Sequence, residues 1–285
     1  MRRTKTEKPR DSVSPWLVRV ASRPAAVPDD IADALARAGS RLGPFNQVSW
    51  HEEVASTNDV AAVMAEHGSV EGHVVAANAQ TAGRGRLGRS WASPSGAGLY
   101  VSAILRPAAD VIPLITIAAG VAVADGVEAA SGLGPRVKWP NDLYVGPRKL
   151  AGILAEAGSS RHGVPHVILG FGINLLTAAY PLEVAARATS IESELGRRCD
   201  RGLVLSECLA ALADRYGALE RGEVDAVLSA WRARAAGSLG RAVEWDAGGA
   251  THRGIAEDID ARGALLVRVE GAVVRVISGE VRWVS

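Results

Sequence analysis

Residues 80–91 constrain the structure of this chain more than any other segment. They read Gln-Thr-Ala-Gly-Arg-Gly-Arg-Leu-Gly-Arg-Ser-Trp, so three glycines alternate with three arginines and a tryptophan follows. Glycine permits unusual backbone angles and lets main-chain N–H groups approach a ligand closely. Arginine presents a planar, permanently charged guanidinium that suits phosphate oxygens. We therefore expect a loop that closes over a phosphate-bearing molecule.

The same segment is also consistent with a solvated basic loop or with an arginine–glycine segment that touches RNA. It is not a P-loop, because the chain has no G-x-x-x-x-G-K-[ST], and no helical pattern follows it as in a dinucleotide-binding fingerprint. The chain has 32 lysines and arginines against 31 aspartates and glutamates, a net charge of +1. This balance argues against a protein that mainly coats nucleic acid, so any positive potential is local.

The composition is that of a globular protein with 48% hydrophobic and 22% charged residues. We expect no apolar run long enough to span a bilayer, and the basic start lacks the apolar segment of a signal peptide. The two cysteines, Cys199 and Cys208, are too few for a disulfide framework or a cysteine-based zinc site. Both are expected to be reduced thiols of a cytoplasmic protein.

The 285 residues allow one large domain and a small one, preceded by an extension. Residues 1–45 form the N-terminal extension, which is partly disordered because its first part, to about residue 28, is polar, basic and rich in proline. A short helix over residues 29–38 leaves no room for a helix-turn-helix. Residues 46–237 form the main domain and residues 238–285 the small one.

The periodicity of apolar residues predicts both helices and strands in the main domain. Helices are expected from the 56–58 cluster to residue 68 and over residues 113–130, 203–219 and 224–234, the second of them apolar nearly all round and therefore buried. Strands are expected over residues 74–77, 99–105, 136–139, 150–156 and 166–169. After residue 238, short strands over 242–245, 251–255, 265–269 and 273–277 predict a small β-barrel.

Four polar clusters accompany the glycine–arginine segment. They are Ser56-Thr57-Asn58 at a helix start, Lys138-Trp139-Pro140-Asn141-Asp142 in a turn, Lys149 in the apolar segment 149–154, and Gly170-Phe171-Gly172-Ile173-Asn174 at a strand end. Each has a plain structural alternative: helix capping, an ordinary turn, a lysine that reaches solvent, and a turn asparagine. The functional interpretation is that hydroxyls and amides surround a neutral polar ligand, while Lys149 reaches an anion or a cavity.

No protein metal site is expected, because the histidines are scattered and no His-x-x-x-His pair lies on a predicted helix. There is also no G-x-S-x-G nucleophile elbow. Any catalysis is therefore expected to rely on positioning and charge stabilisation rather than on a covalent enzyme nucleophile.

In order and spacing, these clusters closely resemble those of the biotin–protein ligases (biotin–[acetyl-CoA-carboxylase] ligases), in a form without an N-terminal DNA-binding domain. The resemblance runs from about residue 48 to the end and includes residues 254–260 and Gly279-Glu280-Val281. The glycine–arginine segment together with the Lys-Trp-Pro-Asn-Asp turn is highly specific. One departure is Leu87, where many members have another arginine. The resemblance implies an α+β catalytic domain, similar to class II aminoacyl-tRNA synthetases, and a C-terminal SH3-like β-barrel.

The resemblance also implies an activity: biotin and ATP form biotinyl-5′-adenylate, and biotin then passes to a lysine of a carrier domain. Biotin is expected to contact Ser56, Thr57, Asn58, Gln80, Gly83, Arg84, Gly85, Arg86, Lys149 and Gly152. The nucleotide is expected to contact Arg86, Arg89, Trp91, Asn141 and Asn174, with Trp91 as the platform for adenine. The catalytic set is Lys149, Arg84, Arg86, Lys138 and Asp142. In it the arginines hold the carboxylate and phosphates, and Asp142 orients or deprotonates the acceptor lysine.

The expected cofactor is Mg²⁺ bound with ATP, and biotin is a substrate. The expected partner is the biotin carboxyl carrier domain of a carboxylase, with no DNA and no membrane, and the chain is expected to be a monomer or a weak homodimer. A lipoate–protein ligase is the nearest rival, but the Arg-Arg-x-x-Gly-Gly-Gly segment typical of that family does not occur. A biotin-sensing repressor or a noncatalytic scaffold is the rival from another class. The intact arginine segment and Lys149 argue against the scaffold, and the missing DNA-binding helices argue against the repressor.

Overall fold

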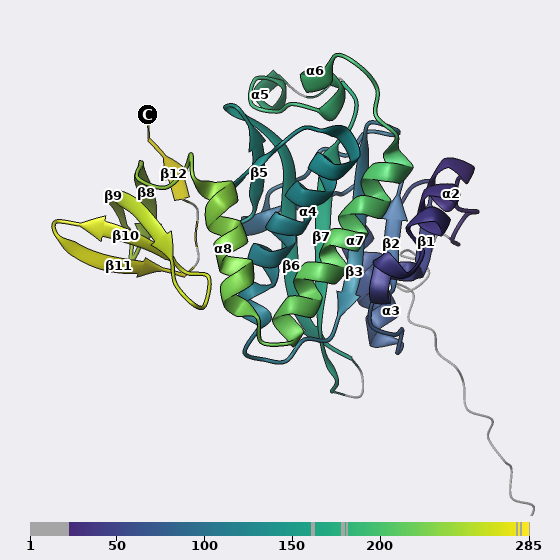
Figure 1. Cartoon of the computed structure of the whole chain (residues 1–285), viewed down its shortest axis with the longest axis horizontal. Helices are drawn as coiled ribbons and strands as arrows, with labels where there is room; N and C mark the ends of the chain where they lie inside the picture. The colour runs from purple at the N-terminus through teal and green to yellow at the C-terminus, as the bar shows by residue number, and fades with distance from the viewer. Residues whose placement is uncertain are drawn as a thin grey trace, which may run out of the picture.

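The computed structural model describes residues 23–160, 163–177, 180, 182–277, 279 and 281–284. Residues 1–22 of the expected disordered tail and Glu280 of the C-terminal motif lie outside the described residues. The expected α+β architecture with a second, small β unit is confirmed (Figure 1).

A mixed seven-stranded sheet forms the centre of the main domain. Its spatial order is β1-β2-β3-β7-β6-β5-β4, in which β1 and β2 are parallel and all other neighbours are antiparallel. The strands are β1 (Val48–His51), β2 (Val74–Ala77), β3 (Gly98–Leu105), β4 (Arg136–Lys138), β5 (Asp142–Val145), β6 (Arg148–Ser159) and β7 (Pro165–Asn174).

The sequence located most of these strands but missed three features. β1 and β5 were not predicted, and β7 runs on to Asn174, beyond the predicted end at residue 169. Glycine weakens a strand pattern, and β7 contains Gly170 and Gly172 in this extra part. β5 begins at Asp142, the last residue of the predicted turn, so turn residues concealed its start.

Helices cover both faces of the sheet. α4 (Ile115–Ser131), α7 (Arg201–Glu220) and α8 (Val224–Ala235) lie over one face (Figure 1). α3 (Thr57–Glu66) packs on the other face, against β2, β3 and β7. Side chains of a strand alternate between the faces. Accordingly Val74 and Ala76 belong to the core under α4, whereas Val75 and Ala77 pack with α3.

The buried helix α4 contradicts the expectation about the length of apolar segments. Residues 112–131 form a continuous helical stretch of 20 residues, which by length and composition could cross a membrane, so the expectation that no apolar run is this long is wrong. Most of this stretch is buried inside the protein. Gly126 lets α7 approach closely, because a Cβ there would lie 2.5 Å from the backbone of Cys208. The apolar surface of α4 is therefore that of a helix in the protein core.

The described segment before the sheet, from Arg23 onward, joins the same core. α2 (Asp29–Ala38) matches the predicted helix, and the 3₁₀ segment η1 (Gly39–Asn46) follows. Ile31 and Phe45 are fully buried, and Asp30 pairs with Arg201 of α7 at 2.6 Å. This segment therefore belongs to the packed body of the catalytic sheet.

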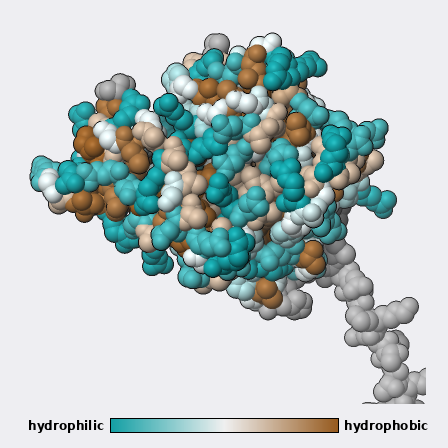
Figure 2. Space-filling model, in the orientation of Figure 1, coloured by the Kyte–Doolittle hydropathy of each residue, from teal (hydrophilic) through white to brown (hydrophobic). Residues whose placement is uncertain are grey.

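A five-stranded antiparallel sheet forms the C-terminal unit, in the order β11-β10-β9-β8-β12. Its strands are β8 (Ala242–Ala247), β9 (Ala250–Ile259), β10 (Leu265–Val269), β11 (Ala272–Val276) and β12 (Val281–Trp283), of which β12 was not predicted. The unit lies beside α8 (Figure 1) and is attached by a hydrogen bond from the Trp139 indole to the Gly263 carbonyl at 2.9 Å. Figure 2 shows hydrophobic residues gathered over this unit on an otherwise mostly hydrophilic face.

Candidate active site

One cavity of about 560 Å³ opens where the sheet, the glycine–arginine segment and the C-terminal unit meet. All of the predicted site residues line it except Gly83. Sequence analysis missed two short helices near the cavity, α5 (Leu182–Ala185) and α6 (Ile191–Leu195). Tyr180 before α5, Val184 on α5, and Arg187 and Ala188 between α5 and α6 also line the cavity. Four lining residues, Gly279, Val281, Arg282 and Trp283, come from the C-terminal unit.

The start of α3 forms an uncharged end of this cavity. Ser56 occupies the N-cap position, yet its side chain makes no capping hydrogen bond, so plain capping does not explain the hydroxyl. Gln80 Oε1 accepts hydrogen bonds from the Thr57 backbone N–H at 2.9 Å and from the Thr57 hydroxyl at 3.2 Å. Gln80 Nε2 donates to Ser93 at 2.8 Å. The amide and hydroxyl groups are thus held by one another before any ligand arrives.

Asn58 is fixed in this end by three elements. Its Nδ2 donates to Glu156 Oε2 at 2.6 Å, and its Oδ1 accepts from the buried Ser102 hydroxyl. Gly170 makes room for it, because a Cβ at that position would lie 2.2 Å from Asn58 Oδ1. The glycine that concealed the end of β7 from sequence analysis is therefore required by the packing of the site.

The glycine–arginine segment folds as a short hairpin. Arg84 and Ser90 form an antiparallel bridge, and the Gly85 N–H donates to the Arg89 carbonyl at 2.7 Å. Gly83 lies at the base, where a Cβ would meet the Trp91 carbonyl oxygen at 2.4 Å. Gly83 thus has a backbone reason to be glycine although it does not line the cavity. At the tip, Leu87 has a positive φ of 56° and is 67% exposed.

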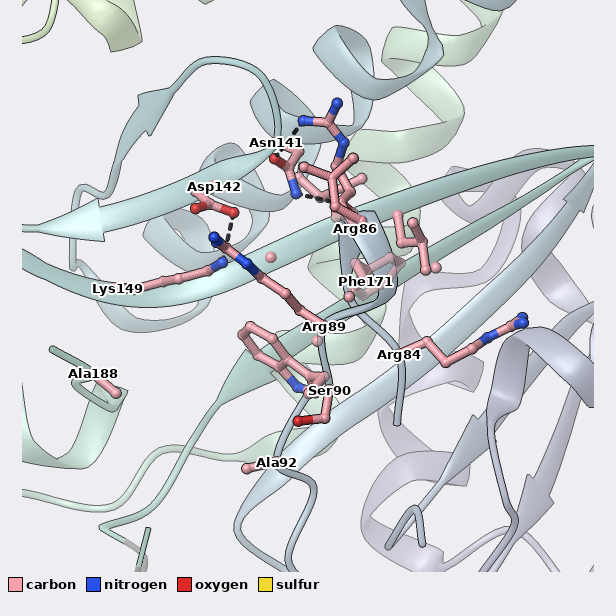
Figure 3. Close-up of a pocket in the computed structure, with 18 of the residues that line it drawn as sticks. Arg84, Arg86, Arg89, Ser90, Ala92, Asn141, Asp142, Lys149, Phe171 and Ala188 are labelled. Carbon is pink, nitrogen blue, oxygen red and sulfur yellow. Dashed lines mark hydrogen bonds and ion pairs between the residues drawn. The ribbon is translucent and has the colours of Figure 1, made fainter. Parts of the chain in front are cut away.

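Arg84 and Arg86 of the hairpin point in different directions (Figure 3). Arg86 reaches Asn141 Oδ1 at 3.2 Å, and burial lowers the pKa of its guanidinium, an effect that the charge of Asp142 opposes. Arg84 extends away from Lys149 and pairs with Asp59 and Glu156, both at 2.8 Å. In this conformation the Arg84 guanidinium is held by two carboxylates rather than directed at Lys149.

Lys149 reaches a partner inside the cavity, and the alternative of a lysine head in solvent is wrong. Its Nζ forms an ion pair with Asp142 Oδ1 at 2.7 Å and lies 5.2 Å from the centre of the Trp91 ring. The Lys149 side chain is 29% exposed and that of Asp142 24%. Figure 3 shows the Arg89 side chain pointing toward the same pair. Two cations and one carboxylate therefore converge on this point, which suits a ligand with several negative charges.

The Trp91 indole lies flat against glycines of the sheet. A Cβ at Gly172 would be 2.5 Å from Trp91 Nε1, and a Cβ at Gly152 would be 3.0 Å from its Cζ3. The indole nitrogen is buried and makes no hydrogen bond with any of the described residues. Gly152 and Gly172 thus create the space for the ring.

The nucleotide-side residues have defined local partners. Asn141 Nδ2 donates to the Ile153 carbonyl at 2.8 Å, and Asn174 Nδ2 donates to the Thr189 carbonyl at 2.9 Å. Lys138 Nζ lies 4.8 Å from the ring centre of Tyr144 and 5.9 Å from that of Trp283. Burial and, to a lesser extent, Asp142 raise the pKa of Tyr144 to about 12, so this phenol is neutral at physiological pH.

Comparison with known proteins identifies the family. Residues 51–174 match the biotin/lipoate A/B protein ligase family, and residues 238–282 match the biotin protein ligase C-terminal domain. A biotin–[acetyl-CoA-carboxylase] ligase of Mycobacterium tuberculosis is 36% identical over 271 residues, which cover 91% of this chain and 96% of the relative. The chain belongs to the biotin protein ligase family.

Other members extend this similarity. The bifunctional ligase/repressor BirA of Bacillus subtilis is 32% identical over 259 residues, 89% of this chain and 79% of the relative. The biotin protein ligase from Aquifex aeolicus, solved in complex with biotin and ATP, has a TM-score of 0.70 at 28% identity and covers 84% of this chain and 99% of its own. The matched catalytic segment begins at His51 and ends at Asn174, and it therefore contains every site residue that the sequence predicted.

Among the residues that sequence analysis missed, Tyr144 and Trp283 line the cavity, and Ser102 and Glu156 hold Asn58. Ser102 carried a signal, because it is the single serine of the apolar strand β3 and is fully buried. The other three gave none. Tyr144 lies on β5, which was not predicted, Glu156 ends a predicted strand, and Trp283 is far from the polar clusters in the sequence.

Proposed function

We propose that this chain activates biotin with ATP and transfers the biotinyl group to a lysine of a biotin carboxyl carrier domain. The observation that carries the proposal is the geometry of one cavity. Its uncharged end offers fixed amide and hydroxyl groups, and its other end offers Lys149, Arg86 and Arg89. Biotin combines a neutral ureido ring, an apolar body and one carboxylate, so its two polar ends match the two ends of the cavity.

The first step joins the biotin carboxylate to the α-phosphate of ATP. A carboxylate oxygen attacks phosphorus, the bond to the β-phosphate oxygen breaks, and pyrophosphate leaves with its electron pair. Lys149 and Arg86 would stabilise the negative charge that develops on the phosphoryl oxygens, which is the largest contribution such a site can make. No enzyme nucleophile is needed for this chemistry.

The second step transfers the acyl group. The acceptor lysine amine attacks the carbonyl of the mixed anhydride, and AMP leaves. A free lysine amine has a pKa of about 10.4 and is mostly protonated at neutral pH, so it must lose a proton. Asp142 would orient it or accept that proton after release from the ion pair with Lys149. Closure of the hairpin over residues 84–90 would exclude water from the anhydride in the interval.

The donor set also suits Mg²⁺ that arrives with ATP. Asp142 is the single carboxylate among the described lining residues, and these residues contain no cluster of three metal-ligating side chains. Mg²⁺ commonly binds through one or two carboxylates together with substrate phosphates and water. When bound, it would neutralise the polyphosphate.

Biotin is favoured over lipoate as the substrate. The relatives are named as biotin ligases, and the amides of Asn58 and Gln80 suit a ligand with a ureido group. Lipoate has no ureido group. We also propose a ligase without a repressor role, located in the cytoplasm and acting as a monomer or weak homodimer. The first of these rests on the Mycobacterium tuberculosis relative, which covers nearly the same length and is named as a ligase alone.

A two-stage assay tests the proposal. The folded chain is incubated with biotin, ATP and Mg²⁺, and biotinyl-adenylate and pyrophosphate are measured; an apo carrier domain is then added and its biotinylation is followed by mass. Lipoate replaces biotin in a parallel reaction, and chelation of Mg²⁺ should stop the first stage. Absence of adenylate from folded protein would exclude the proposed function, and adenylate from lipoate alone would reassign the substrate.

A further inference from the structure

Glu156 of β6 connects the two parts of the site that differ most. Its Oε2 accepts a hydrogen bond from Asn58 Nδ2 at 2.6 Å and one from Arg84 Nη2 at 2.8 Å. The same Arg84 nitrogen lies 2.8 Å from Asp59 Oδ1. One carboxylate therefore holds both an amide of the uncharged end and the base of the glycine–arginine hairpin. None of the steps derived above uses Glu156 or Asp59.

The first consequence concerns the amide of Asn58. An ionised carboxylate only accepts hydrogen bonds, so the group facing Glu156 must be the Asn58 NH₂. The Asn58 oxygen then faces Ser102, whose hydroxyl donates to it. Glu156 thereby decides which atoms of Asn58 remain for a ligand: one N–H and one lone pair, in a fixed orientation.

The second consequence concerns the hairpin. Arg84 is the residue whose backbone pairs with Ser90 to close it. With its guanidinium held between Asp59 and Glu156, the base of the hairpin is fastened to α3 and β6, whereas the tip at Leu87 is exposed. Arg86 and Arg89 lie on either side of this tip, so a movement of the tip over a ligand would carry them with it while the base stays in place.

We infer that Glu156, assisted by Asp59, is a positioning residue that couples occupation of the amide end to closure of the glycine–arginine hairpin. The inference rests on the proposed function, because it assigns this role toward bound biotin and its adenylate. A ligand that hydrogen-bonds to Asn58 stabilises the orientation in which Asn58 donates to Glu156, and Glu156 in turn holds Arg84 at the base of the hairpin. The closed hairpin is thus favoured when a ligand fills the amide end. Coupling requires that the ligand interact differently with the open and the closed hairpin, and Glu156 supplies this difference.

An ordinary surface ion pair is the competing interpretation. The side chains of Arg84, Asp59 and Glu156 are 41%, 38% and 38% exposed, and an isolated pair at that exposure contributes little. Two features distinguish this group. Two carboxylates share one guanidinium nitrogen, and one of them also holds a buried amide of the cavity. Such a network is measured by its effect on the ligand rather than by its effect on unfolding.

The test compares three single substitutions in the full chain. Glu156→Gln keeps the size of the side chain and removes its charge, and Asp59→Asn does the same for the second carboxylate. Glu207→Gln is the matched control, because Glu207 pairs with Arg41 at 2.6 Å outside the cavity. For each variant, the dissociation rate of biotinyl-adenylate, the KM values for biotin and ATP, kcat, and tryptic cleavage of the hairpin with and without biotin are measured.

Loss of a charge-assisted hydrogen bond predicts effects on the order of tenfold. Glu156→Gln should release adenylate about tenfold faster and raise the KM for biotin by a similar factor, with kcat and the KM for ATP changed less than about twofold. Asp59→Asn should speed release about threefold. Biotin should protect the hairpin from trypsin in the wild type and in Glu207→Gln, but not in Glu156→Gln.

A double substitution tests the route of the coupling. If Glu156 acts on the hairpin through Arg84, Glu156→Gln should speed adenylate release little further in an Arg84→Ala background, while it still raises the KM for biotin through Asn58. Wild-type retention, KM and protection in folded Glu156→Gln would overturn the inference and leave the proposed function intact. A wild-type chain that makes no adenylate would instead reject the proposed function itself.

Discussion

The two ends of the cavity are built in opposite ways. At the uncharged end, Thr57, Asn58 and Ser102 are between 0 and 5% exposed and are held by the start of α3 and by strands of the sheet. At the charged end, Arg86 and Arg89 lie on a hairpin whose tip residue Leu87 is 67% exposed. The difference teaches that the groups for a neutral ligand are held in place by α3 and the sheet, whereas two of the charges for phosphate lie on an exposed hairpin.

Physical reasons favour this division. A neutral polar group binds well only where the partner atoms already stand in place, since each hydrogen bond contributes only about 1 kcal/mol net and an unpaired buried group costs more. Charges act over longer distances and are strongest after water has left. A flap can therefore supply them late, when it closes.

The largest effect is expected at the charged end from Lys149→Ala. The rate of adenylate formation should fall about 10²–10³-fold, because a donor aimed at the developing phosphoryl charge is lost. Biotin affinity, measured by calorimetry without ATP, should change less than about tenfold. A loss of biotin binding as large as the loss of rate would show that the two ends are not separate.

Arg86→Ala tests the mobile part of the same end. Adenylate should dissociate roughly 10–100-fold faster, because a charge-assisted contact on the flap is lost. The readout is the release of preformed adenylate after dilution, with Arg41→Ala as a surface control outside the cavity. Unchanged retention would mean that the hairpin tip does not hold the intermediate.

Asn58→Ala tests the preorganised end. Biotin should bind about tenfold more weakly, since one ligand contact is lost and Ser102 and Glu156 lose a partner. The KM for ATP should stay within about twofold. Equal effects on both substrates would argue for a general distortion of the cavity, which a thermal unfolding measurement on the variant would reveal.

Ionic strength separates the two ends without a substitution. Raising salt from about 0.05 to 0.5 M shortens the Debye length to a few ångströms and screens exposed charges. The KM for ATP should rise about three- to fivefold, while the Kd for biotin in the absence of ATP should change little. Equal salt dependence of both constants would contradict the description of the Asn58 end as uncharged in function.

The smallest effect is expected from Trp283→Ala in the C-terminal unit. It removes an aromatic ring 5.9 Å from Lys138 Nζ, an interaction worth roughly 0.5–1 kcal/mol at an exposed site. The KM for ATP should rise about two- to threefold and biotin affinity should not change. A change in biotin affinity would show that the C-terminal unit acts on both ends.

The folded structure gathers the predicted site residues around one cavity, whereas several strands were not predicted. The predicted residues came from the glycine–arginine segment and the polar clusters, and all of them except Gly83 line the cavity. These segments could be recognised because each carries unusual residue types at a fixed spacing. β1, β5 and β12 were not predicted; each has three or four residues and mixes polar with apolar side chains. Short strands depend on their neighbours in the sheet rather than on their own pattern.

The sequence also did not predict which partners the charged side chains contact. Lys149 was correctly recognised as a lysine that does not belong in an apolar strand, but its partner Asp142 was identified only by the folded structure. Arg84 and Arg86 are two residues apart and chemically identical, yet one pairs with Asp59 and Glu156 and the other with Asn141. The directions of two side chains that are two residues apart depend on the backbone conformation between them, which the sequence alone does not give.

The order and spacing of the motifs carried the resemblance to the biotin protein ligases, and this resemblance implied the α+β class and the ligand. Those properties depend on which side chains are present and on short-range order, and both are written in the chain. The tertiary structure decided which carboxylate meets which arginine, and why Gly152, Gly170 and Gly172 must lack side chains. These contacts join residues tens of positions apart, and only the packing of strands and helices brings such residues within hydrogen-bond distance.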